Sequence, residues 1–317
     1  MNEIKTACYA AGVIGSSFAV SFALKDIPCS VYVTNEDRKT RWTAAIENVL
    51  DSLVKIDAIT EERRKEVREK ITVTTDPKEA FDGVCLIQEN GPEKLEVKQE
   101  ILEVIESYAP DDAIIASSTS GMPVTNIAEK AKHPERCIGA HPFNPPHLIP
   151  LVEITKGEKT SQEAVDKAVA IYRQAGKEPV VLLKEKKGFI ANRFSHAVLR
   201  EAMALIAEGA CTPEDADRAL VYGPGIRWAS VGQCMVAELG TAGGVKEGFT
   251  RFAPLNAMIF QDLENLMEVP EGIPEKAEEG VKKLYEENPD CIGHNKEEVS
   301  AFRDKVLVEV LKLHGKL

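Results

Sequence analysis

A histidine and a glutamate stand 12 positions apart in the stretch IGAHPFNPPHLIPLVEIT. His141 directly follows the strand-like run CIGA, and Glu153 lies within the next strand-like run, LVEI. A lone histidine after a strand is more often structural than catalytic. A glutamate inside an apolar strand is different, because burying a carboxylate without a partner costs free energy. Glu153 therefore needs a donor or a cation, and His141 is the candidate.

Such a pair suits the oxidation of a secondary alcohol. That reaction needs a base for the hydroxyl proton while a nicotinamide takes the hydride, and histidine side chains titrate near neutrality. A neighbouring carboxylate fixes the tautomer of the ring and stabilises the imidazolium that forms. The segment ASSTSG, after a predicted strand, adds the hydroxyls of Ser118 and Ser120. Ligands of open α/β sheets bind at this end of the strands, although plain turn chemistry explains these serines equally well.

A nucleotide-binding turn is suggested near the N-terminus, where a predicted strand runs into Ala10-Ala11-Gly12-Val13-Ile14-Gly15 and then a helix. This is the G-x-G-x-x-G layout with its first glycine, which eases the tight turn, replaced by Ala10. The second glycine lets the backbone approach a pyrophosphate and the third lets helix and strand pack closely. Gly12 and Gly15 keep these positions, and the helix N-terminus would attract phosphates. A tight turn that binds nothing is the alternative.

The end of the second predicted strand bears on the coenzyme. NAD-binding units place an acid there to accept hydrogen bonds from the ribose 2′-hydroxyl. Here that position falls on Val33, with Thr34 and Asn35 next in the stretch VYVTNEDRK. The absence of a carboxylate removes one barrier to NADP, whose 2′-phosphate Thr34, Asn35 and Arg38 could contact. In the opposing interpretation a residue of the NED triplet takes over the ribose contact, so NAD is favoured and NADP stays open.

These residues must be positioned by a parallel sheet with crossover helices, which the alternation of β-rich apolar runs and helical periodicity predicts. We expect strands at Thr6–Ala10, Ser30–Val33, Ile71–Thr74, Val84–Gln88, Ala113–Ala116, Cys137–Ala140, Leu151–Ile154 and Pro179–Leu183. We expect helices at Gly15–Leu24, residues 38–56, Thr60–Glu69, Lys94–Ser107 and Val124–Ala131. The fold class is therefore α/β: a Rossmann-like doubly wound sheet over residues 1–186, followed by an all-helical C-terminal domain over residues 187–317.

The composition of the 317-residue chain limits the classes of function. Its formal charge of −12 would repel a phosphate backbone, which argues against a nucleic-acid partner. Seven cysteines without ligand spacing argue for reduced thiols in a cytosol and against a disulfide framework or a metal site. The N-terminus lacks the features of a signal peptide, and no apolar run is long enough to span a membrane. We therefore expect a soluble cytoplasmic protein.

Over its whole length the chain resembles the 3-hydroxyacyl-CoA dehydrogenase family. The stretch EKKGFIANRFSHAVLREAMALIAEG is similar to the family signature: an acidic residue, GF, NR and a long helix that ends in glycine. The spacing of His141 and Glu153, the STSG serines and the stretch IQENGPEKLEVKQE also fit the family. Several motifs in the right order make this resemblance more specific than the glycine-rich turn alone. It implies a nicotinamide-dependent dehydrogenase that acts on a 3-hydroxy acid or a 3-hydroxyacyl thioester.

The resemblance implies a role for each residue of the catalytic set. His141 is the general base in oxidation and the acid in reduction, and Glu153 is its partner. Ser120 hydrogen-bonds the reacting oxygen, and Asn192, from the helical domain, helps to fix the substrate.

Two further residues, Glu93 and Lys98, match positions that line the nicotinamide side of the cleft in relatives. Lys98 could equally be an exposed helix lysine. The expected cofactor contacts are, in full, Ala10, Gly12, Val13, Ile14, Gly15, Thr34, Asn35, Glu93, Lys98 and Ser118.

Within the family, HPFNPPHLIPLVEI and GPGIRWA resemble the branch of lambda-crystallin, L-gulonate 3-dehydrogenase and L-carnitine dehydrogenase. Arg227 could grip a free carboxylate bidentately, which a thioester does not offer, and Trp228 could stack on a quaternary ammonium group. In the alternative interpretation Arg227 pairs with an acid at a dimer interface and Trp228 is a core residue. Carnitine, gulonate, 3-hydroxybutyrate and acyl-CoA substrates all remain open.

A non-catalytic structural or nucleotide-binding protein is the competing hypothesis. The lambda-crystallin branch uses this scaffold for bulk, and Ala10 and Val33 depart from the usual fingerprint. The complete four-residue catalytic set favours the enzyme. Long apolar helices such as Phe189–Ala207 exceed what a helical domain of this size would bury alone, so we expect a homodimer through the C-terminal domain, as in relatives.

Overall fold

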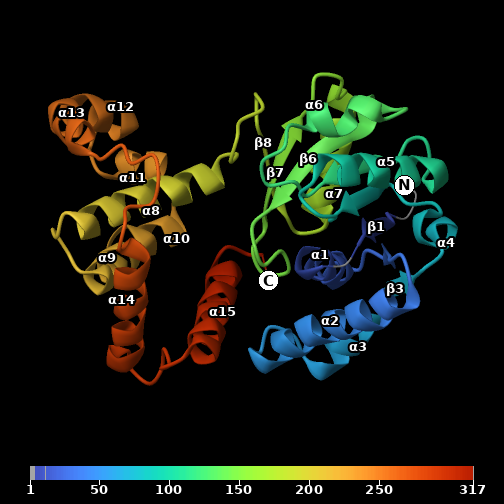
Figure 1. Cartoon of the computed structure of the whole chain (residues 1–317), viewed down its shortest axis with the longest axis horizontal. Helices are drawn as coiled ribbons and strands as arrows, with labels where there is room; N and C mark the ends of the chain where they lie inside the picture. Colours follow the sequence, from blue (N-terminus) through green and yellow to red (C-terminus); the bar gives the residue numbers. More distant parts are fainter. Residues whose placement is uncertain (1–3, 11, 317) are drawn as a thin grey trace. The chain divides into compact units, whose positions relative to one another are not determined.

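The computed structural model describes residues 4–10 and 12–316, so Ala11 of the predicted nucleotide-binding turn lies outside the described residues. The chain forms two compact units: Met1–Ala191 together with His314–Leu317, and Asn192–Leu313. The domain boundary expected from the sequence, between residues 186 and 187, lies a few residues before this division. Figure 1 shows the α/β unit mainly in blue to green and the helical unit in yellow to red.

A single sheet forms the centre of the first unit. Its strands are β1 (Thr6–Tyr9), β2 (Cys29–Tyr32), β3 (Ile71–Thr74), β4 (Leu86–Glu89), β5 (Ile114–Ser117), β6 (Cys137–Pro142), β7 (Leu151–Lys156) and β8 (Glu178–Val181). They are arranged in the order β3-β2-β1-β4-β5-β6-β7-β8, and the order reverses between β1 and β4. The doubly wound sheet predicted from the sequence is confirmed, with most strand ends shifted by a residue or two.

One pair of strands departs from the parallel arrangement that we expected: β6 and β7 are antiparallel. Only residues 143–150 connect them, whereas a parallel connection needs a crossover of about a dozen residues or more. The short loop therefore reverses the chain and places His141 directly opposite Glu153 in the ladder.

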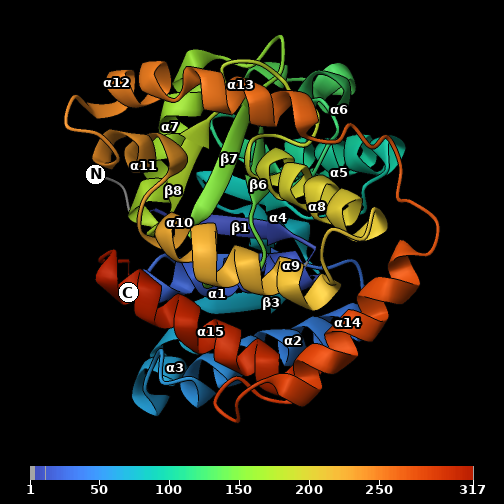
Figure 2. The same ribbon diagram turned by 90° about the vertical axis from the view of Figure 1, so that its left-hand side faces the viewer.

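Helices cover both faces of this sheet (Figures 1 and 2). They are α1 (Val13–Leu24), α2 (Glu36–Lys55), α3 (Glu61–Glu69), α4 (Pro77–Phe81), α5 (Leu95–Tyr108), α6 (Val124–Ile127) and α7 (Gln162–Gln174), with the 3₁₀ turns η1 (Ala128–Lys130) and η2 (Pro134–Arg136). On one face α4, α5 and α6 bury a core that includes Phe81, Ile105 and Ile115. On the other face Phe22 of α1 stacks on Tyr172 of α7, and α2 and α3 pack side by side against α1.

Two of these helices, α4 and α7, were not predicted from the sequence. The signals for α7 are present: Ser161 caps its first turn by accepting a hydrogen bond from the Ala164 N–H at 3.1 Å, and Val165, Ala168 and Tyr172 bury one face. By contrast, α4 has only five residues, which is too short to show a helical period.

The second unit is all helical, as predicted. Its helices are α8 (Ala191–Ala207), α9 (Pro213–Leu220), α10 (Ile226–Ser230), α11 (Gln233–Leu239), α12 (Gly244–Arg251), α13 (Ala253–Asp262), α14 (Ile273–Glu287) and α15 (Lys296–Leu313), with the π-helical turn η3 (Val221–Gly225). The chain kinks in η3 at Gly223, whose backbone angles are not helical, next to Pro224. Within the part of the chain that the structure describes, no helix is both long enough and apolar enough to cross a bilayer.

The turn between β1 and α1 shows what each position of the glycine pattern does. A Cβ added to Gly15 would lie 2.3 Å from the carbonyl oxygen of Ala10, so only glycine lets helix and strand approach this closely. A Cβ added to Gly12 would meet nothing within 4 Å, so the backbone there is open to a ligand. Ala10 has φ 62°, a left-handed conformation that glycine adopts freely but other residues do not. The missing first glycine therefore leaves strain in the backbone.

We expect Ala10→Gly to raise the free energy of unfolding by about 0.5–1 kcal/mol. Relief of left-handed strain, about 1–2 kcal/mol, outweighs the larger entropy of an unfolded glycine, about 0.5–1 kcal/mol. Urea denaturation followed by circular dichroism measures the change. The matched control is Ala7→Gly, since Ala7 is fully buried in β1 and should lose about 1 kcal/mol. If both variants lose the same free energy of unfolding, the backbone of Ala10 is not strained.

Candidate active site

The His141–Glu153 pair lies at the carboxyl end of β6. The two residues face each other across the antiparallel ladder, and 3.1 Å separates His141 Nδ1 from Glu153 Oε2. Both side chains are buried, the glutamate almost completely. The second oxygen, Glu153 Oε1, accepts hydrogen bonds from the backbone N–H groups of Ile190 at 2.7 Å and Ala191 at 2.9 Å. The partner that the buried carboxylate required is therefore His141, joined by two backbone donors that the sequence did not reveal.

These donors decide the charge of Glu153. Burial raises the pKa of its carboxyl group, but the hydrogen bonds from His141, Ala191 and Ile190 outweigh that effect, so the pKa lies below its usual value. An ionised carboxylate only accepts hydrogen bonds. It therefore holds the proton of His141 on Nδ1 and leaves the lone pair of Nε2 available, which is the tautomer that a general base needs.

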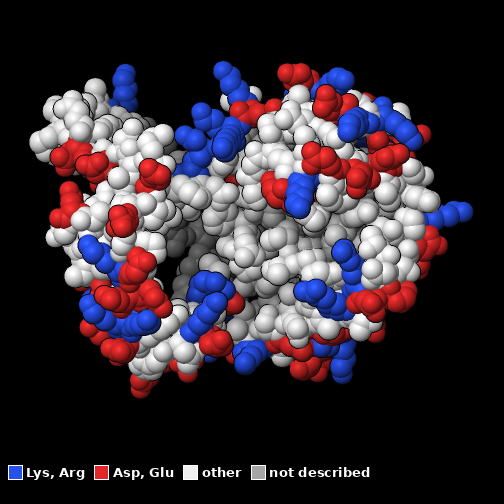
Figure 3. Space-filling view, viewed as in Figure 1, with Lys and Arg blue, Asp and Glu red and all other residues white. Residues whose placement is uncertain are grey.

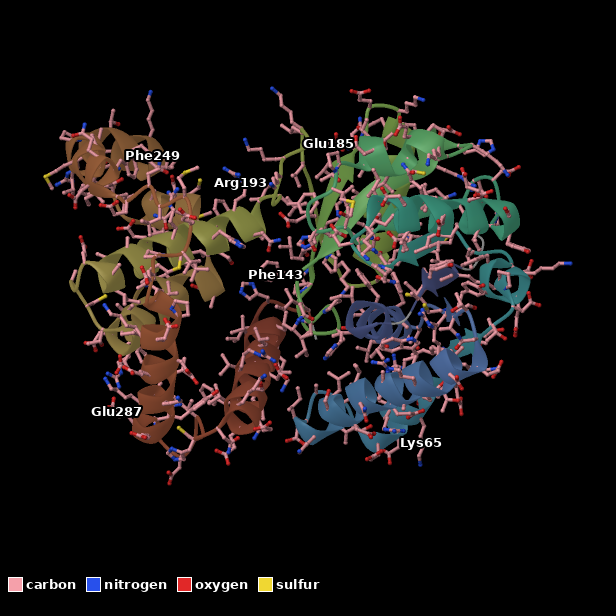
Figure 4. The ribbon with its side chains drawn as sticks, in the orientation of Figure 1. Lys65, Phe143, Glu185, Arg193, Phe249 and Glu287 are labelled. Atoms are coloured by element: carbon pink, nitrogen blue, oxygen red, sulfur yellow. The ribbon has the colours of Figure 1, made fainter. Side chains whose placement is uncertain are left out.

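Phe189 covers the imidazole. Its ring centroid lies 4.9 Å from that of His141, and its side chain is buried. The backbone of Phe189 is left-handed, with φ 49°, in the turn that brings the next two residues to Glu153. Phe189 was not predicted as a site residue, and its one signal in the sequence was its place in the GFIANR motif. Glu185 and Arg193, on either side of this segment, are labelled in Figure 4.

The loop that carries Ser120 is held by Glu93. One carboxylate oxygen, Glu93 Oε1, accepts hydrogen bonds from Thr119 Oγ1 at 2.6 Å, from the Ser120 N–H at 2.9 Å and from the Gly121 N–H at 3.3 Å. The Ser120 side chain is exposed, and no residue in the described ranges hydrogen-bonds its hydroxyl. The structure thus fixes the backbone of Ser120 while leaving its hydroxyl available.

Lys98 is not an exposed helix lysine, so that alternative is wrong. The side chain is 1% exposed and its ammonium group lies 2.9 Å from Glu89 Oε2, with Glu93 Oε2 at 3.6 Å. Glu89 ends β4, is fully buried and also accepts hydrogen bonds from Ser117 Oγ and the Gly91 N–H. Glu89 was not predicted as a site residue, although a glutamate that ends the apolar run VCLIQE needs a partner for the same reason as Glu153.

Ser118 belongs to a second polar chain beside this pair. Tyr172 Oη donates to Gln88 Oε1, Gln88 Nε2 donates to Ser118 Oγ at 2.8 Å, and Ser118 Oγ donates to Asn90 Oδ1 at 2.8 Å. Asn90 in turn donates to the Gln88 carbonyl at 2.9 Å. These hydrogen bonds therefore join the carboxyl ends of β4 and β5. The sheet order reverses between β1 and β4, next to this point, and open α/β sheets bind ligands at such a place.

The residues predicted to contact the coenzyme differ in their exposure to solvent and in the polar groups that they leave available. Val13 is 72% exposed in the first turn of α1, beside the open backbone of Gly12, whereas Val33 is buried and cannot contact a ribose. Thr34 is exposed. Asn35 Oδ1 accepts a hydrogen bond from the Arg38 N–H at 2.9 Å and so caps α2, which leaves the Asn35 amide nitrogen for a ligand.

Three predicted substrate residues belong to the second unit. Asn192 lies in the first turn of α8. Arg227 is exposed, and among the described residues no acid forms an ion pair with it. Trp228 is 44% exposed and donates from Nε1 to Gln233 Oε1 at 3.0 Å, so in this chain it is not a core residue.

An open strand–turn–helix at Gly12 and a carboxylate-held histidine at the end of β6, on one doubly wound sheet, define a dehydrogenase of the Rossmann type. The chain belongs to the 3-hydroxyacyl-CoA dehydrogenase family. Residues 5–186 match its NAD-binding domain and residues 188–272 match its C-terminal domain. The protein is thus an NAD-dependent oxidoreductase of CH–OH groups, and the alternative of a non-catalytic structural protein gains no support.

Curated relatives cover almost the whole chain. It is 34% identical to L-carnitine dehydrogenase of Streptomyces griseus, over 99% of this chain and 90% of that protein, and 32% identical to the enzyme of Oceanobacillus iheyensis, over 98% and 97%. Among solved structures, 5-formyl-3-hydroxy-2-methylpyridine-4-carboxylic acid 5-dehydrogenase, an NAD⁺-dependent dismutase, has a TM-score of 0.76 at 28% identity, with 98% of this chain and 97% of that chain covered. For (S)-3-hydroxybutyryl-CoA dehydrogenase of Ralstonia eutropha the TM-score is 0.64 at 25% identity, with 78% and 88% covered.

We expect Lys98→Met to lower the free energy of unfolding by about 3–5 kcal/mol, because it leaves the buried Glu89 carboxylate without its cation. The double variant Lys98→Met/Glu89→Leu should recover much of this loss, since removing both charges also removes the desolvation cost. A double-mutant cycle in urea measures the coupling. Additive losses would show that the pair does not interact as described.

Proposed function

We propose that this protein oxidises the C3 hydroxyl of a short, free (S)-3-hydroxy acid. The observation that carries the proposal is the His141–Glu153 pair, whose geometry leaves Nε2 of a buried imidazole available as a base. Ser120 and Asn192 complete the proposed catalytic set. The available Ser120 hydroxyl supports its part, whereas that of Asn192 rests on the match to the family signature.

In the proposed reaction His141 Nε2 takes the hydroxyl proton, while the electron pair of the C3–H bond leaves with the hydride and the C3–O bond becomes a carbonyl. Bound NAD supplies the hydride acceptor. The imidazolium that forms is stabilised by the Glu153 carboxylate. The Ser120 hydroxyl donates to the reacting oxygen and Asn192 orients the substrate, so a 3-oxo acid is produced. In reduction His141 returns the proton.

The coenzyme is proposed to lie along the turn at Ala10, Gly12, Val13, Ile14 and Gly15. The open backbone at Gly12 and the N-terminus of α1 would receive its phosphates. Thr34 and Asn35 would contact the ribose, and Glu93 and Ser118 would line the nicotinamide side. The predicted contact of Lys98 is not proposed, because that side chain is buried and lies behind Glu93. NADP remains permitted because no carboxylate replaces Val33 at the end of β2.

The substrate is proposed to be a free acid such as carnitine or gulonate, with Arg227 and Trp228 as its contacts from the helical unit. Arg227 has no acidic partner among the described residues and so can take a carboxylate. The exposed Trp228 ring can stack on a quaternary ammonium group. The L-carnitine dehydrogenases among the relatives support this substrate class.

The protein is further proposed to be a cytoplasmic homodimer that pairs through the helical unit. Leu199, Phe249, Met258 and Phe260 of that unit are 53%, 53%, 63% and 69% exposed, more apolar surface than a soluble domain ordinarily leaves in water. Elsewhere acidic and basic side chains are mixed over the face shown in Figure 3.

We expect His141→Ala to lower kcat by about 10²–10⁴-fold, because the proton has no acceptor, and to leave NADH affinity nearly unchanged. Glu153→Gln should lower kcat by a similar factor, because a neutral amide no longer holds the proton of His141 on Nδ1. Steady-state kinetics and fluorescence titration with NADH measure the two effects. The control is His133→Ala, which removes a half-exposed histidine that pairs with Glu135 at the surface. Full activity in His141→Ala would refute the proposed base.

We expect Arg227→Met to raise the KM for a free 3-hydroxy acid by about tenfold or more, the cost of one charge-assisted contact, without affecting a CoA thioester. Wild type is first assayed with carnitine, gulonate, 3-hydroxybutyrate and 3-hydroxybutyryl-CoA, each with NAD and NADP. The control is Arg251→Met, another exposed arginine of the same unit. An unchanged kcat/KM for the best free acid would exclude Arg227 from carboxylate binding.

A further inference from the structure

The loop of residues 143–150 joins the strand of His141 to the strand of Glu153. Phe143, at its start, is labelled in Figure 4. Backbone hydrogen bonds hold both ends of the loop and one turn within it: the N–H groups of Leu148 and Ile149 donate to the Pro145 carbonyl at 3.0 and 2.8 Å, Phe143 N–H donates to the Leu151 carbonyl at 3.4 Å, and Glu178 N–H donates to the Pro150 carbonyl at 2.9 Å. The loop closes the β6–β7 ladder one residue pair beyond His141 and Glu153, so its conformation bears directly on the position of that pair.

A buried lysine holds the loop at Pro146. Lys177 lies just before β8, and its side chain is 5% exposed. Its ammonium group donates to the Pro146 carbonyl and lies 5.9 Å from the centre of the Phe18 ring. Among the described residues no acid forms an ion pair with it. Burial, and then repulsion from Lys25, lowers the pKa of Lys177 to about 7.

A serine of α1 holds the same loop one residue further along. Ser17 Oγ accepts a hydrogen bond from the His147 N–H at 2.9 Å and lies 2.7 Å from His147 Nδ1. Figure 1 shows the loop descending beside α1, in agreement with these contacts. Ser17 lies on the helix that begins at the glycine-rich turn, so the loop between the catalytic strands is bonded to the helix proposed to bind the coenzyme.

We propose that Lys177 is a positioning residue for the His141–Glu153 pair, acting through the Pro146 carbonyl with Ser17 as a second anchor. This inference rests on the proposed role of His141 as the base. An apolar side chain of similar volume would fill the same space without the cost of desolvating a cation. Packing alone therefore gives no reason for a lysine here. The Nζ donor does something that an apolar residue cannot, which is to hold the Pro146 carbonyl in the loop between the two catalytic strands.

The central test is Lys177→Met, which keeps the volume and removes the donor. We expect kcat to fall by about 10- to 100-fold, the cost of misplacing a catalytic group by about an ångström. The isotope effect on kcat with substrate deuterated at C3 should increase, because the chemical step becomes slower. The melting temperature should stay equal or rise, because a buried unpaired cation is gone. Loss of activity without loss of stability separates positioning from a structural role.

Two further variants accompany Lys177→Met, one as a second test and one as a control. Ser17→Ala removes the second anchor by deleting one oxygen and should lower kcat in the same direction. Lys25→Met removes the exposed lysine next to Lys177, which makes no bond to the loop, and should keep kcat within about two-fold of wild type. The proposal is overturned if Lys177→Met keeps both kcat and the isotope effect of wild type, or if Lys25→Met lowers kcat as much.

A readout that needs no turnover keeps this inference distinct from the proposed function. The ¹⁵N chemical shift of His141 Nδ1 reports its hydrogen bond to Glu153, and we expect it to move in Lys177→Met but not in Lys25→Met. If wild type oxidises none of the four substrates, the proposed function fails while this measurement still decides whether Lys177 positions the pair. An unmoved shift in Lys177→Met overturns the positioning role.

Discussion

The site depends on keeping one carboxylate ionised inside the protein. Glu153 is almost completely buried, where an unpaired charge is costly, and three donors from two separate parts of the chain offset that cost. Two turns supply these donors. The antiparallel turn after β6 places His141 opposite Glu153, and the turn at Phe189 places the N–H groups of Ile190 and Ala191 beside the carboxylate. The placement of the His141 proton on Nδ1 follows from both.

The same constraint made half of the site predictable from the sequence. A glutamate within LVEI needs a partner, and His141 was the candidate. The antiparallel pairing that brings the two together was not predicted, although the eight residues between the strands are too few for a parallel crossover. Ile190 and Ala191 could not be foreseen, because a backbone N–H leaves no mark in the sequence and these two lie 37 and 38 positions from Glu153. The strain at Ala10 was foreseeable in kind, since a glycine position was filled by another residue.

Other parts of the fold were predicted less well, for reasons that differ. Lys98 was open to misinterpretation because a lysine on an amphipathic helix is ordinarily solvated, and only the buried Glu89 beside it changes that. The strands were found because their apolar runs are rich in β-branched residues, and α5 because it is long enough to show a helical period. In the second unit α10, α11 and α12 are short, and a kink at Gly223 precedes them. Local pattern therefore gave the helical class there, while the roles of Arg227 and Trp228 depend on tertiary position.

The two oxygens of Glu153 serve two different parts of the molecule. One orients the imidazole, and the other holds the N–H of Ala191, the residue at which the first unit ends and α8 begins. A single charge therefore both fixes the proton on His141 Nδ1 and holds the chain at the residue where α8 begins.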